Sequence, residues 1–129
     1  MSFFALQIAQ TLGATVVATT SISEKTDRLT KLGATAVVNH RDHPDWSKPV
    51  RAATNEEGVH RLVEVGGPAT IRQSLASLAR RSGEIALIGF AGGGSTAIDF
   101  WEGTRTAARG SFLLMTTPVA GSPAPTCTN

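Results

Sequence analysis

The chain is 129 residues long, which leaves room for one domain, since domains commonly run to about 100 to 150 residues. Hydrophobic residues make up 41% and charged residues 17%, a composition that excludes wholesale disorder. The net charge is only +2 and the basic residues are scattered, so no nucleic-acid partner is expected. No apolar run reaches the roughly 20 residues of a membrane span, and no signal peptide is recognised. We therefore expect a cytoplasmic protein with no membrane partner.

The chain begins with a helical pattern that is followed by a strand pattern. Apolar residues recur at spacings of three and four, which place them along one face of a helix: Phe4, Ala5, Ile8, Ala9 and Leu12. Gly13 should end this helix, because glycine is common at helix C-termini. Residues 14–20 are rich in β-branched side chains and almost continuously apolar, which predicts a strand covered on both faces.

The same alternation then repeats. Ser21 with Glu24 predicts a capping box that opens a helix, and residues 36–39 predict a short strand. A third helix is expected from a cap at Ser47, with Pro49 in its first turn, because an interior proline removes a backbone donor.

The second half of the chain continues the pattern. Residues 61–65 and 84–89 predict strands on either side of a helix over residues 71–79, and residues 110–116 predict a fifth strand. Residues 117–129 have almost no apolar bulk and are expected to form a disordered tail. Alternating helices and strands with short connections favour an α/β fold with a doubly wound parallel sheet, here within a domain of residues 1–116.

Several stretches occur in an order typical of one family. They are FALQIAQ (4–10), LGATVVATTS (12–21), LGA (32–34), VVN (37–39), VEVGG (63–67) and IALIG (85–89). Together they resemble the medium-chain dehydrogenase/reductase superfamily, closest to its zinc-type alcohol dehydrogenase and quinone reductase branches, over residues 2–98. The resemblance implies a Rossmann-like dinucleotide-binding domain. It also implies that the catalytic domain of the family has no counterpart here, so no catalytic residue is named.

The resemblance implies one further feature just before Ser2. Family members have there a strand and a glycine-rich turn of the G-x-G-x-x-G type, which lets a pyrophosphate approach the helix N-terminus. With Met1 as the start we expect both to be lacking, except that Ser2 matches the last position of the turn. That strand is central in the order 3-2-1-4-5-6, so strands two and three should lose contact with strands four to six. The isolated chain should then be marginally stable and inactive.

The end of the second strand indicates which dinucleotide is bound. NAD-binding members normally place an acidic side chain there to hold the ribose hydroxyls. Here Thr20 and Ser21 offer hydroxyl groups, and Lys25 supplies positive charge. Arg41 is expected to meet a phosphate as well, although related quinone reductases use a tyrosine where this chain has His40. The cofactor implied is NADP(H).

Four further candidates lie at the ends of later strands, where family members let the backbone approach the ribose and the nicotinamide: Gly66, Gly67, Gly89 and Phe90. Each candidate also has a plainer interpretation. Ser21 fits a helix cap, Lys25 a solvated lysine, and the glycines ordinary turns. A lone Cys127 and irregularly spaced histidines indicate no metal site.

Two functions of different classes remain open. The first is an NADP-dependent alcohol dehydrogenase or quinone reductase-like oxidoreductase, which transfers a hydride between nicotinamide and an alcohol, carbonyl or activated alkene. Its partners would be the dinucleotide and, in the full-length parent, a small-molecule substrate; a homo-oligomer is left open. The alternative is a non-catalytic nucleotide-binding or interaction module. A methyltransferase is disfavoured, because it too would want a glycine-rich first turn and usually an acid after strand two.

Overall fold

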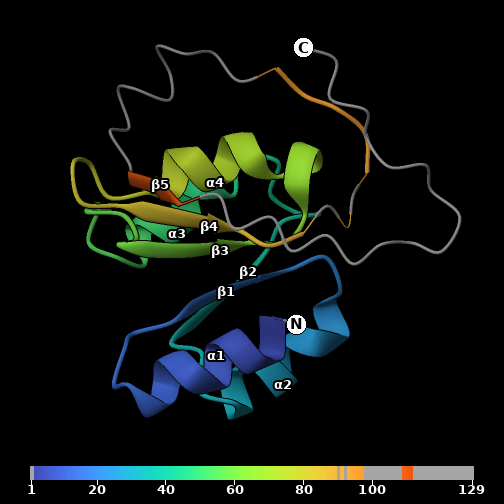
Figure 1. The fold of residues 1–129 in the computed structure, drawn as a ribbon. Helices are drawn as coiled ribbons and strands as arrows, with labels where there is room; N and C mark the ends of the chain where they lie inside the picture. Colours follow the sequence, from blue (N-terminus) through green and yellow to red (C-terminus); the bar gives the residue numbers. More distant parts are fainter. Residues whose placement is uncertain (1, 90, 92, 98–108, 112–129) are drawn as a thin grey trace, which may run out of the picture.

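Helices and strands alternate over residues 2–87. The computed structural model describes residues 2–89, 91, 93–97 and 109–111 (Figure 1). The elements in order are α1 (Ser2–Thr11), β1 (Val17–Thr20), the 3₁₀ helix η1 (Ser23–Lys25), α2 (Thr26–Lys31), β2 (Ala36–Asn39), α3 (Ser47–Ala52), β3 (Arg61–Glu64), the 3₁₀ helix η2 (Gly67–Ala69), α4 (Ile71–Ser77), β4 (Glu84–Leu87) and β5 (Arg109–Ser111). Every strand pair is parallel, which confirms the predicted α/β class.

Most elements are shorter than the sequence patterns predicted, but they lie where expected, and β2 has the predicted bounds of residues 36–39. Gly13 and Gly33 follow α1 and α2 with φ of 75° and 102°, a conformation that glycine adopts without steric cost. The last expected strand begins as β5 at Arg109, and its remaining residues, like the expected tail, lie outside the described residues.

Two predicted helix caps are wrong. The capping box at Ser21 and Glu24 does not form, because the Thr20 hydroxyl accepts a hydrogen bond from the backbone N–H of Ile22 at 3.1 Å. This local bond competes with a helical start, and η1 then begins with no side-chain cap. Ser47 is not a cap either, since it is already the first residue of α3.

The strands of the described residues form two sheets rather than one. One sheet pairs β1 with β2, and the other has the order β3-β4-β5. In the strand order 3-2-1-4-5-6 these are strands two and three and strands four to six. The break therefore falls where the sequence analysis placed it, which confirms that prediction.

On the side of the break, β1 and β3 each have backbone N–H and C=O groups that point away from the strand with which they pair. The N–H of His40 donates to the C=O of Thr20 at 2.9 Å, which fixes the alternation along β1. Because neighbouring residues of a strand direct their backbone groups to opposite sides, Val17 and Thr19 direct theirs away from β2. By the same reasoning Val63 directs its backbone groups away from β4. Such edges are sites for pairing with a further strand.

Three small clusters of buried side chains hold the layers together. Helices α1 and α2 cover one face of β1 and β2 through Leu6, Leu29 and Ala34. Helix α3 covers the other face through Val38, Trp46 and Val50. Helix α4 packs on β3 and β4 through Ile71, Leu75, Leu78 and Ile85. Half-buried Val59 touches the last two clusters, so side-chain packing joins the two sheets where no backbone ladder does.

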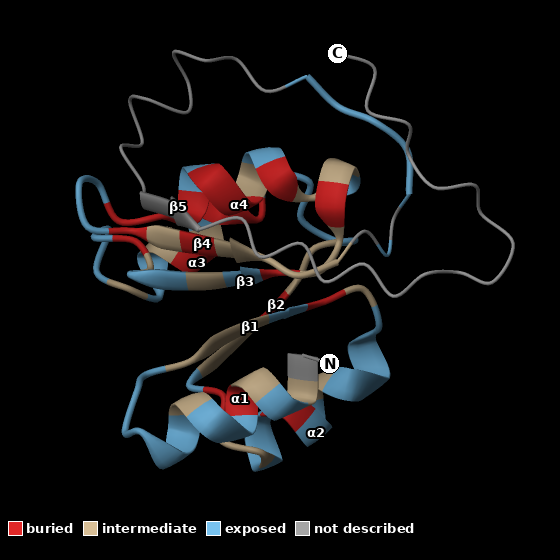
Figure 2. Cartoon of the chain, in the orientation of Figure 1, coloured by how far each residue is buried: buried red, intermediate tan, exposed pale blue. Residues whose placement is uncertain are grey.

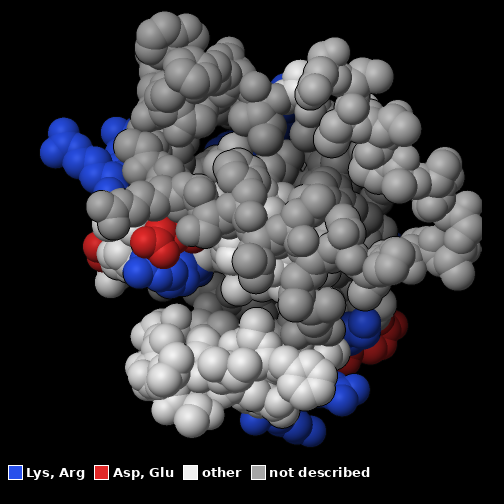
Figure 3. All heavy atoms as spheres, viewed as in Figure 1, with Lys and Arg blue, Asp and Glu red and all other residues white. Residues whose placement is uncertain are grey.

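The apolar stripe predicted for the first helix is not the face that α1 buries. Phe4, Ile8 and Leu12 are 70%, 61% and 79% exposed, whereas Leu6 is 4% exposed. The outer surface of α1 is exposed in Figure 2 and uncharged in Figure 3, since the helix contains neither acidic nor basic residues.

We expect the 129-residue chain by itself to unfold over a broad temperature range. Two sheets without a shared ladder and three small clusters provide little cooperativity. Far-ultraviolet circular dichroism of the purified monomer measures this. A single sharp transition would contradict the view that the break in the sheet weakens the fold.

Candidate functional site

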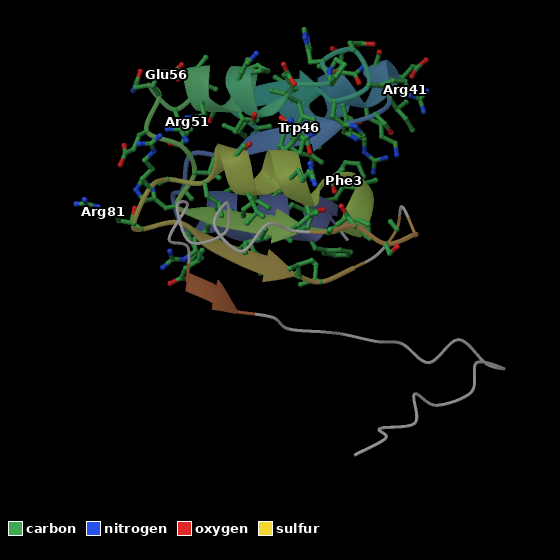
Figure 4. All side chains as sticks on the ribbon, turned by 90° about the horizontal axis from the view of Figure 1, so that it is seen from above. Phe3, Arg41, Trp46, Arg51, Glu56 and Arg81 are labelled. Atoms are coloured by element: carbon green, nitrogen blue, oxygen red, sulfur yellow. The ribbon has the colours of Figure 1, made fainter. Side chains whose placement is uncertain are left out.

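The carboxyl ends of the parallel strands gather at one edge of the molecule. Thr20 and Asn39 pair across the last position of β1 and β2, so the two loops that follow begin side by side. Figure 4 places Arg41 at the end toward which the strands point, with Arg51 and Arg81 at the other end. Open α/β folds collect ligands at this edge, so a cofactor site is expected here.

The end of β1 is a tight turn held by its own side chain. Thr20 is 7% exposed, and its hydroxyl accepts from the N–H of Ile22 at 3.1 Å and donates to the C=O of Ile22 at 3.2 Å. The hydroxyl is thus already engaged, and it shapes the turn that presents Ser21. Ser21 lies half-buried at the tip.

Two residues that the sequence analysis did not single out connect this turn to β2. The side-chain amide of Asn39 donates through Nδ2 to the Ser23 hydroxyl at 3.0 Å. Its Oδ1 accepts from the backbone N–H of Arg41 at 3.0 Å. The sequence offers one signal for this contact, because Asn39 is a polar residue at the end of the otherwise apolar run 36–39. Its partner Ser23 lies 16 residues away in sequence, so the pattern does not reveal the hydrogen bond.

Two solvent-facing cations follow the paired ends of β1 and β2. Lys25 ends η1 and Arg41 follows β2, and both are exposed. Among residues 2–97, the ion pairs that the structure shows are Lys48–Asp45, His60–Glu57 and Arg61–Glu84. None of them involves Lys25 or Arg41, so in the described chain both cations remain available to an anion.

The turn after β3 is organised by a buried carboxylate. Glu64 is 4% exposed, as expected for a strand residue facing a helix. Its Oε1 accepts from the N–H groups of Gly66 at 2.7 Å and Gly67 at 3.1 Å and from the Thr70 hydroxyl at 2.6 Å. Its Oε2 accepts from the Ser74 hydroxyl. One carboxylate therefore fixes both glycines and the start of α4.

Close packing explains two of the three glycines, and backbone conformation explains the third. A Cβ atom at Gly66 would lie 2.3 Å from the Thr70 hydroxyl oxygen, and one at Gly89 would lie 3.0 Å from the carbonyl oxygen of Val65. Gly67 has φ of 75°, which side chains rarely tolerate. Two other sequence candidates are not tested, because Phe90 and the side chain of Ser2 lie outside the described residues.

We expect Glu64→Ala to lower the free energy of unfolding by about 2 to 4 kcal/mol, because buried donors lose a charged acceptor. Glu64→Gln should cost less, since its carbonyl oxygen still accepts from the glycines and its amide can donate to Ser74. Urea titrations of both variants measure the difference. Equal losses would contradict the role given to the acceptor oxygens.

The described part of the chain contains no group of three or more His, Cys, Asp or Glu side chains that could hold a metal ion. None of its helices is long and apolar enough to cross a bilayer.

Comparison with known proteins identifies relatives over most of the chain. The sequence profile described as zinc-binding dehydrogenase matches residues 2–118. A zinc-type alcohol dehydrogenase-like protein of Schizosaccharomyces pombe is 46% identical over 90 residues, which cover 70% of this chain and 26% of that protein.

Solved structures give the same result. An NAD-dependent alcohol dehydrogenase is 32% identical with a TM-score of 0.77, over 88% of this chain and 33% of that one. A mycobacterial protein solved with NADPH is 30% identical with a TM-score of 0.74, over 88% of this chain and 35% of that one. The chain thus spans about a quarter to a third of the length of these relatives. It belongs to the zinc-binding dehydrogenase family of the medium-chain dehydrogenase/reductase superfamily, with the Rossmann-like fold of that family's cofactor-binding domains.

Proposed function

We propose that this chain is the NADP(H)-binding portion of an oxidoreductase that transfers a hydride between nicotinamide and an alcohol, a carbonyl or an activated alkene. The family supports a nicotinamide dinucleotide and oxidoreductase chemistry. The bound dinucleotide supplies the hydride, and the protein orients it. One observation carries the preference for NADP(H): Lys25 and Arg41 stand exposed beyond paired strand ends, and β1 ends without a carboxylate.

The chemistry of these groups fits a phosphate on the adenosine ribose. An acid at the end of β1 would bind the ribose hydroxyls and repel a 2′-phosphate, but Thr20 and Ser21 occupy that position. A guanidinium and an ammonium bind phosphate oxygens through charge-assisted hydrogen bonds. Glu24 and Asp42 adjoin the two cations in sequence, so the preference must come from the placement of the cations and not from the net local charge.

The remaining candidates belong to the same proposal. Gly66, Gly67 and Gly89 would lie along the ribose and nicotinamide, with Phe90 next to them, and Ser2 would lie near the pyrophosphate. A cytoplasmic location, a small-molecule substrate for the whole protein and a homo-oligomer also remain proposals. No catalytic residue is proposed in this chain.

A non-catalytic interaction module is the second candidate function. Two surface features favour it: the edges of β1 and β3 that pair with no strand in the described residues, and the exposed side chains of Phe4, Ile8 and Leu12 on the α1 side. Failure of the chain to bind either dinucleotide would favour this alternative.

We expect Lys25→Ala and Arg41→Ala each to weaken NADPH binding roughly three- to tenfold, with NADH affinity unchanged within about twofold, as for loss of one exposed charge contact. Nicotinamide fluorescence titrations with both dinucleotides measure this. Lys31→Ala is the matched control, since it removes the same charge from the end of α2 that leads into the start of β2. An equal effect of the control would show a general charge effect and not a site.

Introducing an acid at the tip of β1 should reverse the preference. Ser21→Asp places a carboxylate where it can accept from ribose hydroxyls and repel a 2′-phosphate. We expect the ratio of NADPH to NADH affinity to fall at least tenfold, whereas Ser21→Asn, of similar size and no charge, should change it much less. An unchanged ratio in Ser21→Asp would place the adenosine ribose elsewhere.

A further inference from the structure

We propose that Asn39 is a positioning residue that selects for the 2′-phosphate by holding Lys25 and Arg41 in one arrangement. The inference rests on the proposed NADP(H) function and names a residue that does not itself have to touch the cofactor. Asn39 lies at the last position of β2, opposite Thr20.

The two cations come from separate segments. Lys25 ends η1, which follows β1, and Arg41 lies in the loop that follows β2. The backbone ladder continues past the strands only as far as the bond from His40 N–H to Thr20 C=O. Beyond that point the described residues show a single side-chain hydrogen bond between the two segments, from Asn39 Nδ2 to the Ser23 hydroxyl.

The nitrogen and the oxygen of the Asn39 side-chain amide each form a hydrogen bond, and each bond fixes one of the two segments that carry a cation. Nδ2 donates to Ser23 Oγ at 3.0 Å, which ties the first residue of the three-residue η1 that Lys25 ends. Oδ1 accepts from the N–H of Arg41 at 3.0 Å, which fixes the backbone that carries the guanidinium. One planar group thereby sets the positions of both segments.

The location of this amide suits a role in recognition more than one in stability. Ser23 is exposed, Asn39 is half-buried, and neither belongs to any of the three buried clusters. Exposed neutral hydrogen bonds add little to folding. Holding two separate cation-bearing segments in place before the ligand arrives, in contrast, lowers the entropic cost of binding.

Two probes that differ only by the 2′-phosphate test the proposal: adenosine 2′,5′-bisphosphate and adenosine 5′-monophosphate. Calorimetric titrations of the full chain compare wild type with Asn39→Leu, which keeps the size and removes both hydrogen bonds. We expect the bisphosphate affinity of Asn39→Leu to fall roughly three- to tenfold, with monophosphate affinity unchanged within about twofold. Thr30→Ala is the matched control, because it removes an exposed hydrogen bond within α2.

A second variant keeps the test decisive if Asn39→Leu does not fold. Ser23→Ala removes the partner of Nδ2 at an exposed position and should lower bisphosphate affinity in the same direction. Where both variants fold, the double variant should lose less than the sum of the two, because they share one interaction.

The outcomes separate the two proposals. A wild-type chain that binds the bisphosphate no better than the monophosphate would remove the proposed NADP(H) preference, and this inference with it. A wild-type preference that survives intact in Asn39→Leu and in Ser23→Ala would overturn the inference alone. Equal loss of both probes in the variants would also overturn it, since that pattern marks a purely structural role.

Discussion

The parallel pairing of β1 with β2 is the constraint on which the rest of the site depends. Its register sets Thr20 opposite Asn39, and this brings the turn at Ser21 beside the loop at Arg41. A shift of one residue would turn every side chain of a strand to the opposite face. Val38 would then leave its cluster with Trp46 and Val50, so hydrophobic packing protects the register that the proposed phosphate site uses.

The break between the two sheets gives the proposed cofactor a second role. The groups proposed for the 2′-phosphate all belong to the β1–β2 half, whereas Gly66, Gly67 and Gly89 belong to the β3–β4 half. In the described chain no ladder joins these halves. A dinucleotide that contacts both would stabilise their native arrangement by its binding free energy. The Glu64 carboxylate stabilises the β3–β4 half without contacting the β1–β2 half, because its hydrogen-bond donors all lie within residues 66–74.

Local patterns predicted the elements well, because they rest on neighbours in sequence. The apolar run after Gly13 marked β1, and Gly13 and Gly33 marked two helix ends. The position of the break followed from family resemblance and a known strand order. Side-chain hydrogen bonds were missed: the local bond from the N–H of Ile22 to the Thr20 hydroxyl takes the place of the expected capping box, and Asn39 binds Ser23 on the neighbouring segment, 16 residues away in sequence. The exposure of the α1 stripe likewise depends on what packs against it and not on its spacing.

The central claim is that a phosphate on the adenosine ribose lies between the ends of β1 and β2. Amide chemical-shift mapping by nuclear magnetic resonance, with adenosine 2′,5′-bisphosphate added to the chain, tests it most directly. We expect the largest shifts to fall on residues 21–25 and 39–41. Largest shifts elsewhere, with those amides unmoved at saturation, would contradict it.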